Sequence, residues 1–449
     1  MRAGRRHSGW IMFQQQEAVS FVRGMREASP YIRAHRDHVF VVYLGGEALL
    51  DGRFAHHVQD LTLLHGIGVK LVIVHGARPQ IDTRLEAANI ASRWCRHIRV
   101  TDAAVLAEVK LAVAGARIAV EAQFSHATLN RPLGGSPLRI VGGNFVVARP
   151  AGIIDGIDLQ FTGEIRKVDA AAIRRQLDHD DLVLVSPIAY SPTGEVFSLN
   201  ALDLATAIAA AIDAAKLIVL CEGPGVTGPD GAVLRELTPR EATALPLAEP
   251  LRQVMACALD ACNAGVGRVH LVPREIDGAL LLELFTRDGV GTLVSSTPFD
   301  RLRPATIDDV GGILELIEPL EREGILVKRS REKLEMEIDH FTVVERDDTV
   351  VACGALYPFA AAAMAEIACI AVHPEYRCNG FGDALLAALE QQAEVHGLAQ
   401  VFALTTHTAH WFQEKGYVRV GIGDLPIERR ELYNYRRNSI VLTKALGKA

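Results

Sequence analysis

The residues best suited to chemistry form a short loop near the C-terminus, Arg377-Cys378-Asn379-Gly380-Phe381-Gly382, which reads R-x-x-G-x-G. Glycines at 380 and 382 remove side chains where backbone N–H groups must approach a bound anion. The apolar spacing that follows predicts a helix, whose positive end would face the same point. We therefore expect a pyrophosphate cradle. A dinucleotide site is not indicated, because G-x-G-x-x-G and an acid about 20 residues later are both missing. The alternative is a strand-turn-helix corner that needs glycines only for its turn.

The elements around this loop are predicted from the apolar pattern. A strand at 367–372 leads into the loop, a strand pair at 342–345 and 350–357 precedes it, and a strand at 400–405 and a short helix at 410–415 follow. This order, with the R-x-x-G-x-G loop and the sequence HWFQEKGY, resembles the GCN5-related N-acetyltransferases. The resemblance implies a mixed α+β fold that takes acetyl-CoA as co-substrate. Its cofactor-binding positions would be Ile370, Ala371, Val372, Arg377, Cys378, Asn379, Gly380, Phe381 and Gly382.

The composition indicates a soluble globular protein of two or three domains, with 449 residues, 49% hydrophobic and 22% charged. A formal net charge of −7 argues against nucleic-acid partners. The seven cysteines form no C-x-x-C pair, which favours reduced thiols over disulfides or a zinc site, so no metal is expected. No apolar run reaches the ~18 residues of a membrane span. The basic opening MRAGRRHSGW lacks a following signal-peptide core, so we expect a cytoplasmic protein without membrane contact.

The first 300 residues alternate apolar strands with helices. Strands are expected at 39–44, 70–74, 182–185 and 217–220, which predicts a doubly wound, mostly parallel sheet. The segments FVVYLGGEAL, LVIVHGARPQI and CEGPGVTGPDG resemble the amino-acid kinases, N-acetylglutamate kinase in particular.

The departures from that kinase concern its phosphate-binding residues. The family's lysine before the double glycine is replaced by Tyr43, and its H-G-G-G loop is interrupted by Ala77 and Arg78. Phosphoryl transfer depends on positioned cations and backbone donors, so we expect a kinase fold without kinase chemistry.

The end of this region, LLLELFTRDGVGT, resembles the arginine site of arginine-inhibited kinases. The resemblance implies that Glu283 binds the guanidinium in two-point fashion and that Gly289 and Tyr31 complete the site. On the residues alone, Glu283 would be a solvated helix carboxylate and Tyr31 a core aromatic. Residues 1–298 are thus expected to form a catalytically silent, arginine-sensing domain. A linker over 295–300 would join it to the acetyltransferase domain, residues 299–449.

Two basic stretches, 326–331 and 429–437, flank the acetyl-CoA core. Such stretches are usually solvated faces, but beside a cleft in an acidic protein they favour an anionic substrate. With ILVKRSREKLEMEID, ALYPF and LYNYRRNS, they resemble the bacterial two-domain N-acetylglutamate synthase family over nearly the whole chain.

That resemblance implies acetylation of the α-amino group of L-glutamate, the first step of arginine biosynthesis, with inhibition by L-arginine. The ammonium of glutamate must lose a proton before attack, and Glu366 matches the family's proposed base. The N–H of Ile370 is expected to hold the thioester oxygen. Carboxylate-binding positions would be Leu326, Lys328 and Arg329 for the α-carboxylate and Thr405, Arg429 and Arg437 for the side chain. A homo-oligomer, a hexamer in this family, is also implied.

Two alternatives belong to other classes of function. An active N-acetylglutamate kinase is disfavoured by Tyr43 and Arg78, and a non-catalytic arginine sensor is disfavoured by the intact loop and Glu366.

Overall fold

The computed structural model describes residues 22, 24–26, 28–128, 138–286, 289–295, 300–346, 349–377 and 380–447. The chain divides into two compact units, Met1–Thr297 and Pro298–Ala449. The linker expected over 295–300 is shorter than predicted, because residue 295 ends one strand and residue 300 begins the next. Residues 296–299 lie outside the described part of the chain.

The first unit is built on a large sheet with the strand order β14-β16-β15-β13-β1-β2-β10-β5 within the described residues. Its strands pair in parallel except for β15 with β16. A second sheet has the order β12-β11-β6-β9. The strands are β1 (Val39–Leu44), β2 (Lys70–His75), β3 (Arg93–Cys95), β4 (Ile98–Val100), β5 (Ile140–Val141), β6 (Val146–Pro150), β7 (Ile153–Ile154), β8 (Ile157–Asp158), β9 (Gly163–Val168), β10 (Leu182–Val185), β11 (Ile188–Tyr190), β12 (Val196–Ser198), β13 (Lys216–Cys221), β14 (Glu236–Leu237), β15 (Arg268–Pro273) and β16 (Thr292–Ser295).

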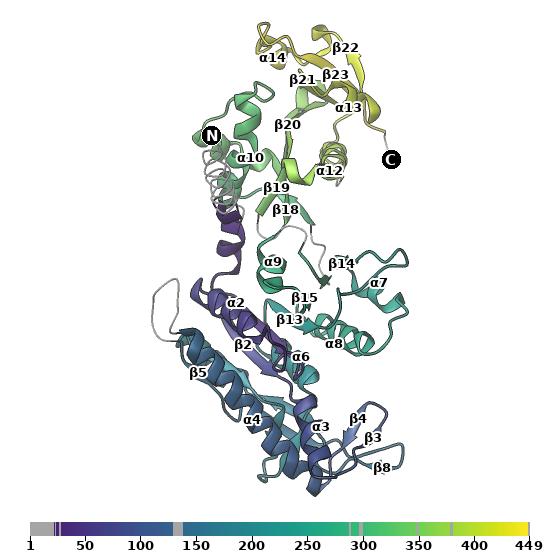
Figure 1. The fold of residues 1–449 in the computed structure, drawn as a ribbon. Coiled ribbons are helices and arrows are strands. Elements are labelled where there is room, and N and C mark those ends of the chain that lie inside the picture. The colour runs from purple at the N-terminus through teal and green to yellow at the C-terminus, as the bar shows by residue number, and fades with distance from the viewer. Residues whose placement is uncertain are drawn as a thin grey trace, which may run out of the picture. The chain divides into compact units, whose positions relative to one another are not determined.

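Helices cover both faces of the large sheet (Figure 1). The α-helices of this unit include α2 (Phe54–Gly66), α3 (Arg78–Ala87), α4 (Ala103–Thr128), α5 (Ala170–Asp178), α6 (Ala201–Ala211), α7 (Pro239–Ala244), α8 (Leu251–Asn263) and α9 (Ala279–Phe285). Successive strand residues point to opposite faces, so Val41 packs in the core of α5, α6 and α8, whereas Phe40 and Val42 pack in the core of α2, α4 and α9. Strands buried on both faces are mostly apolar, as the sequence predicted for this sheet.

The second unit is a mixed sheet with the order β17-β18-β19-β20-β21-β23-β22 among the described residues. Its strands are β17 (Asp300–Pro304), β18 (Phe341–Arg346), β19 (Thr349–Phe359), β20 (Met364–Val372), β21 (Gln400–Thr405), β22 (Val418–Val420) and β23 (Ile440–Ala445). Its α-helices are α10 (Val310–Arg322), α11 (Arg331–Met336), α12 (Phe381–Val395), α13 (Ala409–Glu414) and α14 (Ile427–Glu431).

The helices of this unit also lie on two faces of their sheet (Figure 1). Ile313 of α10 and Leu334 of α11 pack with Val343 of β18, whereas Leu385 of α12 packs with its neighbour Val344. The predicted architecture is confirmed: a domain with a mostly parallel, helix-covered sheet is followed by a mixed α+β domain.

Candidate active site

The site begins where two parallel strands of the second unit separate. β20 pairs with β21 only at Met364, Ala365 and Glu366, although β20 continues to Val372. On its other edge β21 pairs with β23 along its whole length, from Gln400 to Thr405. The backbone of β20 after Glu366 therefore faces an opening in the sheet.

A β-bulge lies at this opening. Cys353 of β19 pairs with Ala371 and Ala355 pairs with Ala368, so Cys369 and Ile370 together oppose the single residue between them. Cys369 has a φ of 56°, which is uncommon for a residue with a side chain. Bulges re-aim the backbone of the longer strand, and here the re-aimed residue is Ile370, whose N–H is expected to meet the thioester oxygen.

The predicted cradle lies at the N-terminus of α12. Gly380, at the N-cap, has a φ of 78°, and a side chain there would meet no described atom within 4 Å. No described side chain caps this 15-residue helix, so its first N–H groups are available to an anion. The ring of Phe381 is buried, so this residue offers only its backbone, while Arg377 is exposed. Cys378 and Asn379 lie outside the described residues.

Glu366 is the third residue of β20, inside the strand rather than at its surface end. Its Oε2 accepts a hydrogen bond from Nε of Arg429 at 2.5 Å, and its Oε1 accepts one from Nη2 at 3.0 Å. The two side chains are only 12% and 22% exposed. The hydrogen bond to Glu366 raises the pKa of Arg429 above its usual value. The structure thus joins the predicted base and a predicted substrate ligand, which lies on α14, in a two-point ion pair.

Two further predicted arginines lie near Arg429. The pKa of Arg437 is lowered by burial and by the charge of Arg329, and repulsion from Arg329 also opposes the raised pKa of Arg429. Arg437 donates from Nη2 to the carbonyl of Ile325, and the buried Nε of Arg329 has no hydrogen-bond partner among the described residues. Arg329 and Arg437 therefore add positive charge near the Arg429–Glu366 pair, and Arg329 has a buried donor without an acceptor among the described residues.

The other predicted substrate residues are placed differently. Leu326 packs against the core of α10 and Lys328 is exposed. The Thr405 hydroxyl accepts hydrogen bonds from the N–H groups of His407 and Thr408, at 3.2 and 2.9 Å, and also contacts the Thr408 hydroxyl. Thr405 therefore shapes the turn after β21, and its hydroxyl has three local partners.

In the first unit, Glu283 on α9 is not a solvated carboxylate. Its Oε1 lies 2.8 Å from Nδ1 of His270, and its Oε2 accepts from the N–H groups of Val290 and Gly291, at 2.9 and 2.8 Å. Burial acts to raise the pKa of Glu283, but these hydrogen bonds outweigh it and the pKa falls. Burial lowers the pKa of His270, so we take its ring as neutral and donating from Nδ1. Its buried Nε2 has no partner among the described residues.

Of the other two predicted arginine-site residues, Gly289 lies against Glu283, whereas Tyr31 is connected to α9 through His35. A side chain at Gly289, which has a φ of 58°, would collide with Oε2 of Glu283. Tyr31 lies in the helix at residues 28–35, with its ring 6.4 Å from that of His35. Nε2 of His35 is 2.8 Å from the carbonyl of Leu284, next to Glu283.

The kinase-like cleft contains a cavity of about 660 Å3 whose lining includes Tyr43, Gly45, Gly46, Arg78 and Trp94. Burial raises the pKa of Tyr43, so the position of the family's lysine holds a neutral hydroxyl. The guanidinium of Arg78 lies 4.8 Å from the ring centre of Trp94.

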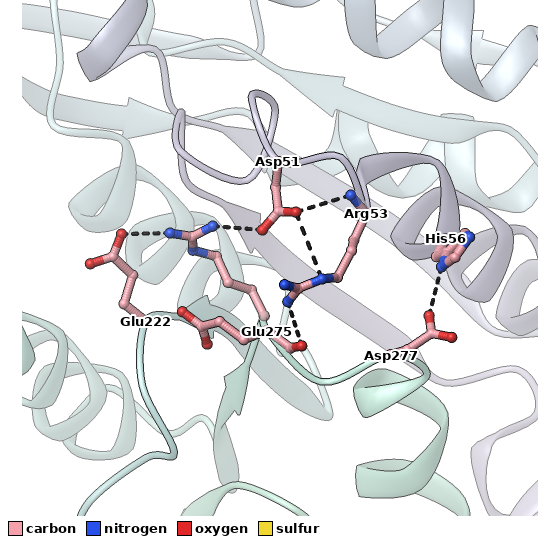
Figure 2. A network of polar contacts seen from close by, with 7 residues as sticks. Asp51, Arg53, His56, Glu222, Glu275 and Asp277 are labelled. Carbon is pink, nitrogen blue, oxygen red and sulfur yellow. Dashed lines mark hydrogen bonds and ion pairs between the residues drawn. The ribbon is translucent and has the colours of Figure 1, made fainter.

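Charged residues at the nearby carboxyl ends of the strands pair with one another (Figure 2). Arg274, which follows β15, donates to Asp51 at 2.9 Å and to Glu222 at 2.6 Å. These contacts tie together the segments that follow β1, β13 and β15.

Sequence reasoning missed two features. His270 could have been noticed as the one ionisable residue in the apolar segment VHLVP, residues 269–273. The pairing of Glu366 with Arg429, 63 residues apart, had no signal in the sequence.

Within the described residues, no group of three or more His, Cys, Asp or Glu side chains could hold a metal ion. The described helices include none that is long and apolar enough to cross a membrane.

Known proteins resemble both units. The model of the amino acid kinase family matches residues 38–273, and that of the acetyltransferase (GNAT) family matches residues 312–417. The amino-acid acetyltransferase of Azotobacter vinelandii (strain DJ / ATCC BAA-1303) is 50% identical over 429 residues, which are 95% of this chain and 99% of that protein. That of Escherichia coli (strain K12) is 46% identical over 441 residues, 96% and 100% of the two chains.

A solved structure is also similar over most of the chain. The N-acetylglutamate synthase from Neisseria gonorrhoeae, complexed with coenzyme A and L-arginine, has a TM-score of 0.83 and 37% identity, and the match covers 95% of this chain and 100% of that one. Fold and site define an acyltransferase of the GNAT class that follows an amino-acid-kinase-like domain. The chain belongs to the amino-acid acetyltransferase family, the two-domain N-acetylglutamate synthases.

Proposed function

We propose that the enzyme transfers the acetyl group of acetyl-CoA to the α-amino group of L-glutamate, as the first step of arginine biosynthesis, and that L-arginine inhibits this transfer. The observation that supports this choice of acceptor is the ion pair of Arg429 with Glu366, together with two further arginines, Arg329 and Arg437, whose charges act on one another nearby. The two carboxylates of an acceptor would give these guanidinium groups further partners, including the buried Nε of Arg329. The Neisseria gonorrhoeae enzyme, also solved with coenzyme A and N-acetyl-glutamate, supports this choice.

The roles of the other residues follow from their positions. Glu366 would accept one proton from the glutamate ammonium, which leaves a neutral amine to attack the thioester carbon. The N–H of Ile370 would stabilise the oxygen as negative charge develops on it. The C–S bond then breaks, and the thiolate takes up the second proton that the nitrogen loses. The N-terminus of α12 would hold the pyrophosphate of the co-substrate.

The proposed inhibitor site is the end of α9. Glu283 keeps one lone pair on Oε1, and the buried Nε2 of the neutral His270 is an acceptor without a partner among the described residues, so both suit a guanidinium. The kinase-like domain would then be a sensor without kinase chemistry, because Tyr43 supplies no cation for phosphoryl transfer. We also expect a cytoplasmic homo-oligomer, a hexamer by resemblance to the family.

The test is to follow release of the CoA thiol with L-glutamate, L-aspartate, L-glutamine and L-ornithine, each with and without L-arginine. We expect glutamate to give the highest kcat/KM and arginine to lower it. Faster turnover with ornithine or glutamine would contradict the proposed acceptor, and turnover that arginine leaves unchanged would contradict the proposed inhibitor.

A further inference from the structure

We infer that Arg429 exchanges partners during the reaction: it holds Glu366 until the side-chain carboxylate of the acceptor replaces that residue, and this exchange frees the base. The inference rests on the proposed function and deepens it. It makes Arg429 a residue that determines which acceptor is acetylated, in addition to one that binds the acceptor.

The first support is the geometry of the ion pair. Nε and Nη2 form the side of the Arg429 guanidinium that can donate two hydrogen bonds to one carboxylate, and both donate to the oxygens of Glu366. The remaining nitrogen, Nη1, donates to the carbonyl of Leu432 at 3.4 Å. A carboxylate that approaches the first side must therefore displace Glu366. In turn, both oxygens of Glu366 are engaged by N–H donors, so the carboxylate is poorly placed to take a proton from an amine.

The second support is burial. Because both side chains are largely buried, separating them without replacement would leave two uncompensated charges, which is strongly unfavourable. Glutamate supplies both replacements. Its side-chain carboxylate takes the place of Glu366 on Arg429, and its ammonium takes the place of Arg429 on Glu366. The ammonium is then in contact with the carboxylate that accepts its proton.

The third support is the surrounding charge. Arg329 repels Arg429, and its effect is visible in the lowered pKa of Arg437 as well. Without an anion, Glu366 is the acidic group that Arg429 contacts among the described residues. An acceptor without a side-chain carboxylate, such as glutamine, brings an ammonium but no replacement for Glu366 on Arg429. It should therefore react slowly even when it is bound.

The decisive probe is N-acetyl-L-glutamate, which has the side-chain carboxylate but no ammonium. In the parent enzyme, binding of N-acetyl-L-glutamate must break the ion pair between Glu366 and Arg429, and it gives Glu366 no positive charge in exchange. In Glu366→Gln the ion pair is replaced by a weaker hydrogen bond to a neutral amide, so we expect N-acetyl-L-glutamate to bind about tenfold more tightly, the factor of one charge-assisted hydrogen bond. Titration calorimetry of the full-length enzyme with CoA present measures this. The control is Glu428→Gln, an exposed carboxylate on α14 whose change should leave the affinity as it is.

A kinetic test uses glutamine as acceptor. Arg429→Ala should raise kcat for glutamine about tenfold while it lowers kcat/KM for glutamate, because the base is no longer held. Arg429→Lys, whose single ammonium cannot hold both oxygens, should act in the same direction, and the exposed neighbour change Arg430→Ala should do neither.

The outcomes separate the two proposals. If the parent acetylates glutamate but Glu366→Gln binds N-acetyl-L-glutamate no more tightly than the parent, the exchange is wrong and the proposed function stands. The same holds if Arg429→Ala and Arg429→Lys lower turnover with glutamine as well as with glutamate. A parent enzyme that does not acetylate glutamate contradicts both.

Discussion

Gly289 lies directly against the carboxylate of Glu283, so that a Cβ at position 289 would collide with Oε2. The same oxygen accepts two backbone hydrogen bonds, from Val290 and Gly291. A side chain at 289 would therefore disturb the buried group to which we assign arginine binding.

We expect Gly289→Ala to lower the free energy of unfolding of the first unit by more than the cost of an alanine in a left-handed backbone conformation. That backbone costs an alanine about 1–2 kcal/mol, and displacing Glu283 should add about 1–3 kcal/mol for its lost hydrogen bonds. Gly278→Ala is the matched control, because Gly278 has a φ of 69° and open space around it. Urea unfolding compares the two, and equal losses of stability would contradict the predicted collision.

Glu366→Gln should keep CoA binding and lose about 10²–10⁴-fold in turnover, the usual contribution of a positioned base. The amide can still accept a hydrogen bond from Arg429, so the fold should be preserved. Single-turnover acetylation at neutral pH measures the loss. Turnover at the parental rate would remove Glu366 from the mechanism.

Gly380→Val should raise KM for acetyl-CoA more than KM for glutamate, because a branched side chain would occupy the space in front of the α12 N-terminus. Gly397→Val provides the comparison at the other end of the same helix. Gly397 has a φ of 73°, against 78° for Gly380, and both lie in open space. The free-energy cost of a valine in a left-handed backbone conformation should therefore be similar in the two variants. Steady-state kinetics on both variants tests the position of the cradle, and an equal rise in KM for acetyl-CoA would contradict it.

The elements that the sequence predicted best are those whose pattern is local. β1, β10 and β21 have the predicted bounds, because each is an apolar run that ends at turn residues. The bounds of α13 and β20 differ by a few residues from the predicted 410–415 and 367–372, since capping and pairing partners decide them.

The site was less accessible to sequence reasoning. The motif located the loop before α12, but the ion pair of Glu366 with Arg429 depends on where β20 and β21 separate. Glu283 was interpretable on its residues alone only as a solvated carboxylate, because its partner His270 lies in a different element. Contacts of this kind are fixed by tertiary packing and leave no periodic pattern.

A buried ion pair at the start of the acetyltransferase unit gives a prediction that depends on pH. Asp309 accepts from both Nη atoms of Arg303, at 2.7 and 2.8 Å, and from the N–H of Thr306. Burial alone would raise the pKa of Asp309, but these bonds outweigh it and lower the pKa below 3.8. The native state thus favours the ionised form, which stabilises the fold fully above about pH 4 and less as pH falls through the lowered pKa.

Asp309→Asn should therefore cost roughly 3 kcal/mol of stability at pH 7, in the range for breaking a buried pair. The difference from the parent should shrink as pH falls below about 4. Asp308→Asn, an exposed neighbour, should cost little. Thermal unfolding across this pH range checks the sign, and a difference that grows on acidification would contradict it.

Glu283→Gln should weaken inhibition by L-arginine at least tenfold, because a guanidinium bound there would lose its charged partner, a hydrogen bond of about 1.5–3 kcal/mol. The amide oxygen can still accept from Val290 and Gly291, so uninhibited turnover should stay within a few-fold of the parent. Glu86→Ala, an exposed helix carboxylate in the same unit, is the control.

Thermodynamic linkage gives a second measurement of the coupling between arginine binding and glutamate binding. If arginine lowers the affinity for glutamate by a given factor, glutamate must lower the affinity for arginine by that factor, typically 5- to 150-fold. Calorimetric titration of arginine in the absence and presence of glutamate, with CoA bound, measures it. In Glu283→Gln arginine should bind weakly in both conditions. A variant that stays fully sensitive to arginine would place the inhibitor site elsewhere in the chain.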